Sequence, residues 1–383
     1  MITSYAGEKG SVGYPPWPSP TLCHLKRLTD GCGIIQHAKF RCPDYSNGYC
    51  TDDNSRALIV ATRYFGWCDD PDAAELMVRY LSFLRFTQNP DGSMRNFVSY
   101  GRTFLDEAGS FDCTGQTVWA LGEAAACGLE YVAVPAGEMF RLAVPHVTAD
   151  FPPHSLAYAL LGICAYGQRG EFREAARLAA RPLADALFGY YRRERADGWE
   201  WFLPILTYAS ARLPQALLCC GLLLEDDVLL TAGLRSLDFL RHETVCEGLF
   251  SPVGCHGGYP RGGLRAEFDQ QPIDSGAMVE ACITAFEVTG KACYWDDALC
   301  AMGWFFGNNA LGLSLYDEES GGCHDGLHST GVNENEGAES TIVHLLALLA
   351  VHTASPVSQV RQGEMPPKSV ADGGGYYWKA AGV

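Results

Sequence analysis

The stretch from Asn333 to Ala350 reads NENEGAESTIVHLLALLA, an acid-rich polar half followed by an apolar half. A helix that is apolar nearly all round, as residues 342–350 would be, is typical of a protein interior. Acidic and hydroxyl side chains gather just before it, where the first backbone N–H groups of a helix lack intrahelical partners. The stretch therefore predicts a buried helix with a polar site at its N-terminal end.

The same arrangement occurs five more times along the chain. Polar segments at Asp52, Asp112, His154, Thr207 and Asp274 each precede an apolar pattern. The apolar patterns predict buried helices at residues 57–65, 117–127, 156–166, 216–224, 276–288 and 342–350. Between them, amphipathic patterns predict helices at residues 20–38, 71–86, 135–148, 172–192, 227–241 and 295–310.

These alternating helices decide the fold class. Successive polar segments lie roughly 40 to 70 residues apart, a period that indicates a helical array. An open solenoid needs polar end caps and has no need of helices that are apolar all round. We therefore predict an all-α (α/α)6 toroid, in which six inner helices are ringed by six outer ones and all polar segments lie at one end.

Length and composition set the domain boundaries and the location. Of 383 residues, 48% are hydrophobic, which is enough for a large core, and no run of about 18 apolar residues predicts a membrane span. We expect an irregular arm at residues 1–19, one barrel domain at 20–353 and a loose Pro/Gly-rich tail at 354–383. The first 20 residues lack the order of a signal peptide, so a cytoplasmic protein is expected.

Charge and cysteine usage narrow the partners. A formal net charge of -17 opposes nucleic acid and anionic membranes and suits a neutral or cationic ligand. Many of the sixteen cysteines lie inside apolar helical patterns, where cysteine behaves as a small hydrophobic residue, and no CxxC pair occurs. We expect reduced thiols, no metal and no required cofactor.

Carboxylates, amides and aromatic rings gather in the polar segments. That combination suits carbohydrate chemistry, because rings stack on sugar faces, acids and amides pair with hydroxyls, and two carboxyl groups flank the scissile bond. The candidate catalytic residues are Asp53, Glu339, Asp112 and Asp274. The candidate substrate-binding residues are Asp52, Arg56, His154, Trp199, Glu200, Trp201, Tyr259, Asp269, Gln271, Asn335 and Glu336. An enzyme that cleaves an oligosaccharide is expected.

Asp53 and Glu339 are the leading acid/base pair, because a closed ring brings the sixth polar segment beside the first. Asp53 is the expected acid, since repulsion from Asp52 favours a proton on one of the two. A wide opening favours carboxyl groups roughly 6.5–9.5 Å apart and hence inversion. Hydrolysis and phosphorolysis both stay open.

Some of these residues have simpler structural interpretations. Polar residues before helices are often N-caps, and we expect that role for Ser155, Ser275 and one of Asp52 or Asp53. Trp199 and Trp201 flank Glu200 in an alternating pattern, so both indoles face either a sugar or the protein interior.

Three short motifs carry a resemblance to a known group. YCTDDNSRAL (Tyr49–Leu58), FDQQPID (Phe268–Asp274) and NEGAESTI (Asn335–Ile342) resemble bacterial six-hairpin glycosidase-like proteins. Some members are fused to glycosyltransferases or accompany mannoside phosphorylases. The resemblance covers most of residues 20 to 353 and implies the (α/α)6 barrel and a glycosidase-type site.

Three alternatives remain open. A sugar epimerase or isomerase on the same barrel needs a pair of histidines as acid and base, and of the available histidines only His154 falls at an inner-helix start. A zinc enzyme could use Cys255, His256, Cys323 and His324. Cys255-His256-Gly257 resembles the zinc-binding Cys-His-Gly of lanthipeptide cyclases, although Asp325 stands where the second copy needs glycine. A non-catalytic sugar-binding module is the third.

Overall fold

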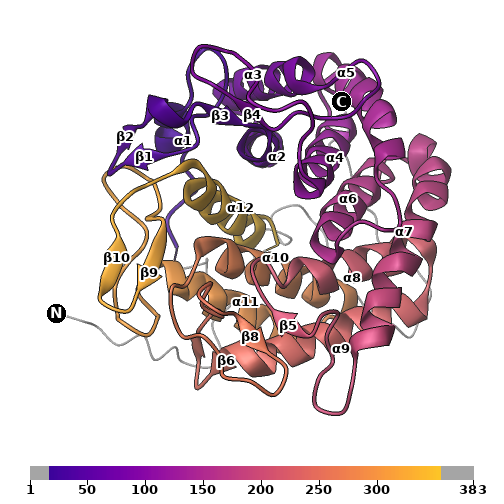
Figure 1. Cartoon of the computed structure of the whole chain (residues 1–383), viewed down its shortest axis with the longest axis vertical. Coiled ribbons are helices and arrows are strands. Elements are labelled where there is room, and N and C mark those ends of the chain that lie inside the picture. The colour runs from indigo at the N-terminus through magenta and orange to yellow at the C-terminus, as the bar shows by residue number, and fades with distance from the viewer. Residues whose placement is uncertain (1–16, 355–383) are drawn as a thin grey trace.

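Six helices form a closed inner ring, viewed along its axis in Figure 1. The computed structural model describes residues 17–354. The inner helices are α2 (Thr51–Cys68), α4 (Phe111–Ala126), α6 (Pro153–Tyr166), α8 (Arg212–Leu224), α10 (Pro272–Thr289) and α12 (Ala338–Ala354). Each packs against the next, and α12 packs against α2. The predicted (α/α)6 toroid is confirmed.

Outer helices pack against the inner ring. They are α3 (Pro71–Thr87), α5 (Glu130–Ala143), α7 (Arg173–Glu194), α9 (Asp227–Thr244) and α11 (Ala292–Phe305), each against the inner helix that precedes it. The short helix α1 (Cys23–Leu28) takes the sixth outer position, against α12. Single-turn 3-10 helices occur at η1 (Tyr45–Asn47), η2 (Val144–His146) and η3 (Gly170–Phe172).

The helix predicted at residues 20–38 is mostly wrong. After α1 the chain turns at Asp30, whose carboxylate accepts hydrogen bonds from the backbone N–H groups of Cys32 (2.7 Å) and Gly33 (3.2 Å). A side chain that bonds its own backbone in this way competes with helix formation. The hydrophobic residues that suggested a helix are buried nonetheless, because Ile34 and Ile35 lie in the core.

Short antiparallel strand pairs tie the connections together. Within residues 17–354 the pairs are β1 (Ala38–Lys39) with β2 (Cys42–Pro43), β3 (Tyr49–Cys50) with β4 (Phe97–Val98), β5 (Ile205–Leu206) with β8 (Tyr259–Pro260), β6 (Val245–Cys246) with β7 (Leu249–Phe250), and β9 (Gly326–His328) with β10 (Gly331–Asn333). The β5–β8 pair joins the connection into α8 to the connection into α10. These pairs hold the loops around one end of the ring.

The inner helices begin about one turn earlier than predicted. Helix α2 starts at Thr51, so Asp52 and Asp53 lie in its first turn rather than in a preceding loop. Asp112 and Asp274 are likewise inside the first turns of α4 and α10. The acids are therefore on the rigid helices of the ring, which fixes the direction in which they point.

The predicted caps are wrong for the same reason. Cys50 caps α2 and Ser110 caps α4, each accepting from a backbone N–H group three residues on, at 3.4 Å and 3.1 Å. The Ser155 hydroxyl instead donates to Asp112, and the Ser275 hydroxyl donates to the Ala301 carbonyl at 2.7 Å. Both serines thus join neighbouring helices.

Glycines bring α4 and α6 into backbone contact. A Cβ atom added at Gly122 would lie 2.1 Å from the carbonyl oxygen of Gly162, and one at Gly115 would lie 2.5 Å from that of Ser155. No larger residue fits at either place without moving a helix. The close crossing sets Asp112 of α4 directly beside Ser155 of α6.

A buried ion network fills the ring farther along the helices. Arg63 of α2 pairs with Glu123 of α4 at 2.6 Å and also with Glu280 of α10, which in turn pairs with Arg212 of α8. The Arg212 guanidinium lies 4.7 Å from the centre of the Trp119 ring. Burial alone would raise the pKa of Glu280, but Arg212 and Arg63 lower it below its ordinary value.

The N-terminal end of the described chain packs on the outer layer and beside the C-terminal end of α12. Trp17 stacks on Phe306 with ring centroids 4.8 Å apart, and the Pro18 carbonyl lies 3.1 Å from Nε2 of His352. Most of the expected arm (1–19) and tail (354–383) lies outside the described residues. Nowhere in residues 17–354 does a helix combine the length and apolar character of a membrane span.

Candidate functional site

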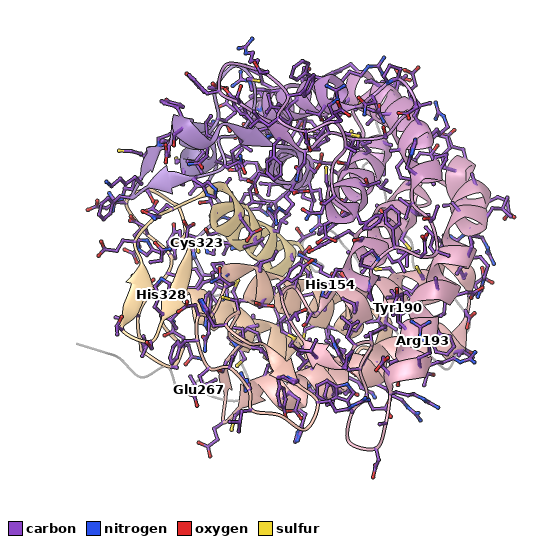
Figure 2. All side chains as sticks on the ribbon, viewed as in Figure 1. His154, Tyr190, Arg193, Glu267, Cys323 and His328 are labelled. Carbon is purple, nitrogen blue, oxygen red and sulfur yellow. The ribbon has the colours of Figure 1, made fainter. Side chains whose placement is uncertain are left out.

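The N-terminal ends of the inner helices meet at one end of the ring. Asp112 of α4 accepts hydrogen bonds from Ser155 of α6 and from Tyr208 in the connection to α8. Where the ring closes, Arg56 of α2 pairs with Glu339 of the neighbouring helix α12. These contacts, the closeness of Asp274 to Glu339 and the stacking of His154 on Tyr208 bring together the predicted acids of the first, second, fifth and sixth segments and the predicted histidine of the third. Figure 2 shows His154 toward the middle of the ring.

Arg56 joins two of the predicted catalytic acids. Its guanidinium donates to Asp53 at 2.6 Å and to Glu339 at 2.7 Å. Arg56 and Asp53 are buried, whereas 48% of the Glu339 side chain is exposed. One oxygen of Glu339 is thus held by a cation while the carboxylate stays open to a ligand.

Asp52 lies half-buried beside this pair. Its Oδ2 atom accepts a hydrogen bond of 2.9 Å from Asn96, and its Oδ1 atom is buried without a hydrogen-bond partner. Burial raises the pKa of Asp52 to about 6, against the opposing effects of Arg56 and Asn96. An unpaired buried carboxyl oxygen is costly unless a ligand hydroxyl completes it.

His154 and Tyr208 form a stacked pair in the opening. Their ring centroids are 4.7 Å apart and the planes differ by 16°. Burial lowers the pKa of His154 to about 4, although the charge of Asp112 opposes that shift, so the imidazole is neutral near pH 7. Nε2 of His154 is buried without a hydrogen-bond partner. Tyr208 is 42% exposed and carries the accessible face of the pair.

Among the acids of the opening, Asp274 has the pKa that is shifted farthest from its ordinary value. Burial raises its pKa to about 8, and the nearby charge of Glu339 raises it further. The backbone N–H groups of Ala209 and Ser210 act in the opposite sense. Near neutral pH the Asp274 carboxyl group therefore carries a proton, and it lies within the electrostatic reach of Glu339.

The contacts of Trp199 and Trp201 give no support to their predicted stacking role. Both indoles are buried, and both pack against Phe239 of the outer helix α9. Nε1 of Trp199 donates to the Leu203 carbonyl at 2.9 Å. The alternating pattern turned these rings toward the outer helices, where they fill space between α7, α8 and α9.

Glu200 and Tyr259 share that environment. Glu200 accepts a hydrogen bond from Tyr191 of α7, and Tyr259 lies edge-on to Trp199 with centroids 5.7 Å apart. The substrate-binding role predicted for Glu200 and Tyr259 has no support from these contacts.

Glu336 and Asn335 point away from the opening. Glu336 is buried against α1, where it accepts a hydrogen bond of 2.6 Å from Ser320 and lies 3.5 Å from Nδ1 of His24. Burial raises its pKa to about 7. Asn335 accepts from the backbone of Phe40 at 2.9 Å. These contacts with His24, Ser320 and the Phe40 backbone give no support to the predicted sugar-binding role of Glu336 and Asn335.

Asp269 and Gln271 lie beside the start of α10. Gln271 is the N-cap residue of that helix, and Asp269 pairs with His256 and His328. In Figure 2, His154 lies toward the middle of the ring and His328 over the β9 side. Asp269 and Gln271 therefore border the opening on its α10 side.

Sequence reasoning missed Asn96, Tyr158 and Tyr208 as site residues. Tyr158 lies one helical turn after His154, and its pKa is raised by burial and by the charge of Asp112. Its spacing of four residues from His154 on one helix would have indicated it. Asn96 comes from a connecting loop, and nothing in its local sequence marks it.

The zinc ligand set predicted from two Cys-His pairs does not form. Cys323 is buried and donates to its neighbour, the His324 carbonyl. Among residues 17–354, the one group of three potential ligands whose donor atoms converge is Cys255, His256 and Asp269. The prediction failed because the second pair belongs to a buried segment of the loop before α12.

Two hollows on the outside of the barrel contain none of the predicted site residues. One, of about 410 Å³, borders α3, and the other, of about 490 Å³, lies between α9 and α11. The chemistry of the chain is therefore concentrated at the ring opening.

No protein-family model matches the sequence, and no curated protein matches it. The fold, in contrast, matches solved structures. A sugar epimerase from a ruminal bacterium matches with a TM-score of 0.68 at 10% identity, covering 87% of this chain and 95% of that one. A D-mannose isomerase matches with a TM-score of 0.64 at 14% identity, covering 86% and 95%.

A glycoside hydrolase has the same architecture. The α-mannanase of family GH76 from Bacteroides thetaiotaomicron matches with a TM-score of 0.61 at 10% identity, covering 87% of this chain and 93% of that one. At these identities the likeness concerns the fold. The resemblance to six-hairpin glycosidase-like proteins is thereby confirmed as a shared (α/α)6 barrel.

Proposed function

We propose that this chain is a carbohydrate-active enzyme that cleaves a glycosidic bond in an oligosaccharide, with Asp274 as general acid and Glu339 as general base. The observation that carries the proposal is that two carboxyl groups interact at one opening: Asp274, whose pKa burial raises to about 8, and Glu339, which is paired with Arg56. Displaced pKa values of neighbouring acids are what assigns acid and base roles.

Each carboxyl group has a role in the proposed reaction. Asp274 donates its proton to the glycosidic oxygen as the bond to the anomeric carbon breaks. Glu339 takes a proton from the water that attacks that carbon from the opposite face, and the product has the inverted configuration. Arg56 holds Glu339 in place through the 2.7 Å hydrogen bond.

Asp53 receives a different role from the one expected from sequence. Its carboxylate is committed to Arg56 at 2.6 Å and is buried. We assign it to positioning: it fixes the guanidinium that in turn fixes Glu339. Asp274, which has no such cation partner, takes over the role of acid.

The remaining polar groups of the opening would bind sugar hydroxyls. Asp52 offers a buried unpaired oxygen and His154 a buried unpaired nitrogen. The exposed face of Tyr208, backed by His154, is suited to stack on a sugar ring. Asp112 orients Tyr208 through the hydroxyl hydrogen bond.

A sugar epimerase is the second candidate, favoured by the neutral His154 at the opening and by the similar folds of an epimerase and an isomerase. That reaction exchanges a proton on carbon next to a carbonyl and would need a second base. Product analysis separates the two. Epimerisation in D2O introduces carbon-bound deuterium, whereas bond cleavage creates a new reducing end.

The deciding experiment screens purified protein against oligosaccharides with and without phosphate. Proton NMR of the first product follows the anomer formed and distinguishes hydrolysis from phosphorolysis. Asp274→Asn and Glu339→Gln should each lower turnover by at least 100-fold. Matched changes at exposed acids, Asp197→Asn and Glu138→Gln, should leave it unchanged. Folded Asp274→Asn and Glu339→Gln variants that both retain full turnover would exclude this pair.

A further inference from the structure

Three separate segments of the chain meet beside the start of α10. The backbone N–H of Cys255 donates to the Asp269 carbonyl at 2.9 Å, and that of Gly254 donates to the Ala266 carbonyl at 2.8 Å. Gln270 and Leu327 exchange two backbone hydrogen bonds of 2.9 Å. These bonds set Cys255, Asp269 and His328 on adjacent strands of backbone, although they are up to 73 residues apart.

A glycine permits the closest of these approaches. A Cβ atom at Gly254 would lie 2.1 Å from the carbonyl oxygen of Phe268, so a larger residue there would push the two segments apart. The close backbone approach therefore fixes where Cys255 and Asp269 lie relative to each other.

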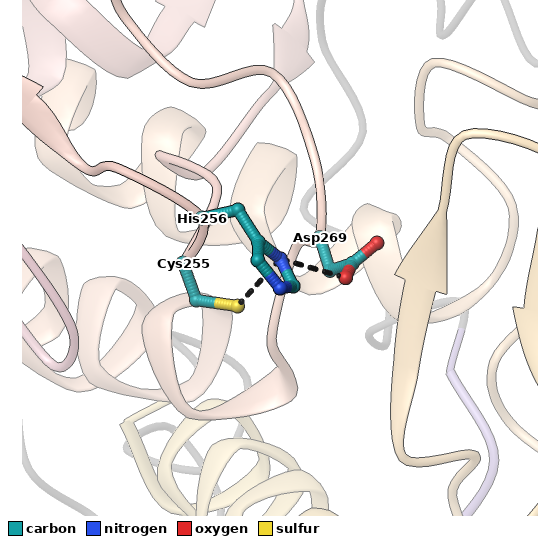
Figure 3. Close-up of side chains that lie close together, drawn as sticks. All are labelled: Cys255, His256 and Asp269. Carbon is teal, nitrogen blue, oxygen red and sulfur yellow. Dashed lines mark hydrogen bonds and ion pairs between the residues drawn. The ribbon is translucent and has the colours of Figure 1, made fainter.

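The donor atoms of Cys255, His256 and Asp269 converge, as Figure 3 shows. Sγ of Cys255 lies 3.7 Å from Nδ1 of His256, which lies 2.9 Å from Oδ2 of Asp269. All three donor atoms are within 4.8 Å of one another. Ligands at 2.0–2.3 Å from a tetrahedral ion lie roughly 3.3–3.8 Å apart, so an ion fits after side-chain shifts of up to about 1 Å.

A second histidine supports the carboxylate. Nδ1 of His328 lies 2.6 Å from Oδ1 of Asp269, the oxygen that does not face His256. Metal-binding carboxylates are commonly held by such an outer partner, which orients them and completes their hydrogen bonding. The arrangement is a set of three ligands with an orienting group, built from three chain segments.

We propose that Cys255, His256 and Asp269 bind a Zn²⁺ ion, with His328 as the positioning residue on Asp269. A thiolate with an imidazole and a carboxylate selects zinc over calcium or magnesium, which prefer oxygen ligands. Binding removes the thiol proton of Cys255 to solvent, and the sulfur electron pair forms the Zn–S bond. A water molecule completes the fourth position.

The ion would join two parts of the connection between α9 and α10, and His328 would attach the β9–β10 hairpin to it through Asp269. Cys255 and His256 belong to the long connection between α9 and α10, and His328 belongs to the β9–β10 hairpin before α12. Asp274, the proposed acid, follows Asp269 by five residues and lies in the first turn of α10. Zinc therefore holds the α10 side of the opening in place and takes no part in the proton transfers.

Metal binding by purified protein tests this directly, without any sugar substrate. Chelator-treated protein, kept reduced, is titrated with Zn²⁺ against a chromophoric competitor and, separately, with Co²⁺. We expect one ion per chain and a thiolate-to-cobalt charge-transfer band. Cys255→Ser should abolish that band and, like His256→Gln and Asp269→Asn, weaken zinc binding at least tenfold. His328→Gln should weaken it about 10- to 100-fold.

Matched variants at exposed cysteine and histidine positions nearby provide the control. Cys246→Ser and His242→Gln should leave the band and the affinity unchanged. Absence of stoichiometric zinc, or equal binding by Cys255→Ser and Cys246→Ser proteins, would overturn the proposal. Because the readout is metal affinity, a chain that binds zinc yet cleaves no glycoside would refute the proposed function alone.

Discussion

Arg56 of the first inner helix and Glu339 of the last lie 2.7 Å apart across the point where the ring closes. The same guanidinium holds Asp53, and all three groups belong to one charge cluster at the opening. The proposed base is thus positioned by a contact that exists only when α2 and α12 are neighbours. Fold and chemistry are coupled at this pair.

Replacing Arg56 should therefore damage stability and turnover together. Arg56→Met leaves Asp53 buried without a cation, which costs about 3 kcal/mol or more of unfolding free energy. Arg79→Met, which breaks the pair between Arg79 and Glu75 on the surface of α3, is the control and should cost about 0.5 kcal/mol or less. Urea unfolding measures both. Equal losses in the two variants would contradict the role of Arg56.

Asp274→Asn should stabilise the protein near pH 7 while removing turnover. A folded pKa of about 8 against an ordinary 3.8 means that the folded state holds the proton more tightly, so stability falls as pH rises from 3.8 to 8. The variant lacks that penalty and should gain about 4 kcal/mol at pH 7, and less than about 1 kcal/mol at pH 4. Thermal unfolding at both pH values checks this.

The wild-type pH profile offers a related measurement. Turnover should decline as pH rises through about 8, because Asp274 loses the proton that it donates. A profile flat from pH 6 to 10 would assign the acid role to another residue.

His344 predicts a sensitivity to acid. It is fully buried among Phe305, Phe306 and Tyr316, and burial lowers its pKa to about 3. A folded pKa below the ordinary 6.5 gives stability that is present above pH 6.5 and lost as pH falls toward 3. His344→Leu should therefore reduce the loss between pH 7 and pH 5 by about 2 kcal/mol. His242→Gln, at an exposed histidine, should not.

Tyr208 and Trp201 should separate binding from packing. Tyr208→Ala removes an exposed ring and should weaken sugar affinity by about 1 kcal/mol or more with little loss of stability. Trp201→Ala empties a buried site and should destabilise by about 3–5 kcal/mol without altering the affinity of the folded fraction. Calorimetric titration and unfolding curves give both quantities. The reverse pattern would restore Trp201 as a sugar platform.

The architecture could be predicted from sequence because a helix that is buried on all sides has apolar residues on all sides. Helix α12 has no polar face, and such a helix needs neighbours all round it. Six of them with outer partners define a ring. The helix predicted at residues 20–38 mostly does not form. There the Asp30 side chain bonds the nearby backbone, and tertiary packing buries Ile34 without a helix.

Side-chain direction could not be predicted in the same way. Glu336 and Glu339 stand three residues apart in one acidic run, yet the first faces His24 on the outside and the second faces Arg56 at the opening. The difference arises because α12 starts at Ala338, between them. If a helix starts one turn earlier or later, the predicted direction of a nearby side chain reverses. Helix propensity does not locate helix ends to within one turn.

Closure between α2 and α12 also imposes an order on synthesis. Helix α2 is complete by Cys68, but its neighbour on one side ends at Ala354. A nascent chain therefore holds the apolar face of α2 without its partner while 286 residues are still to be added. At roughly 5–20 residues per second this lasts tens of seconds. We expect chaperones to bind that apolar face until α12 packs against it.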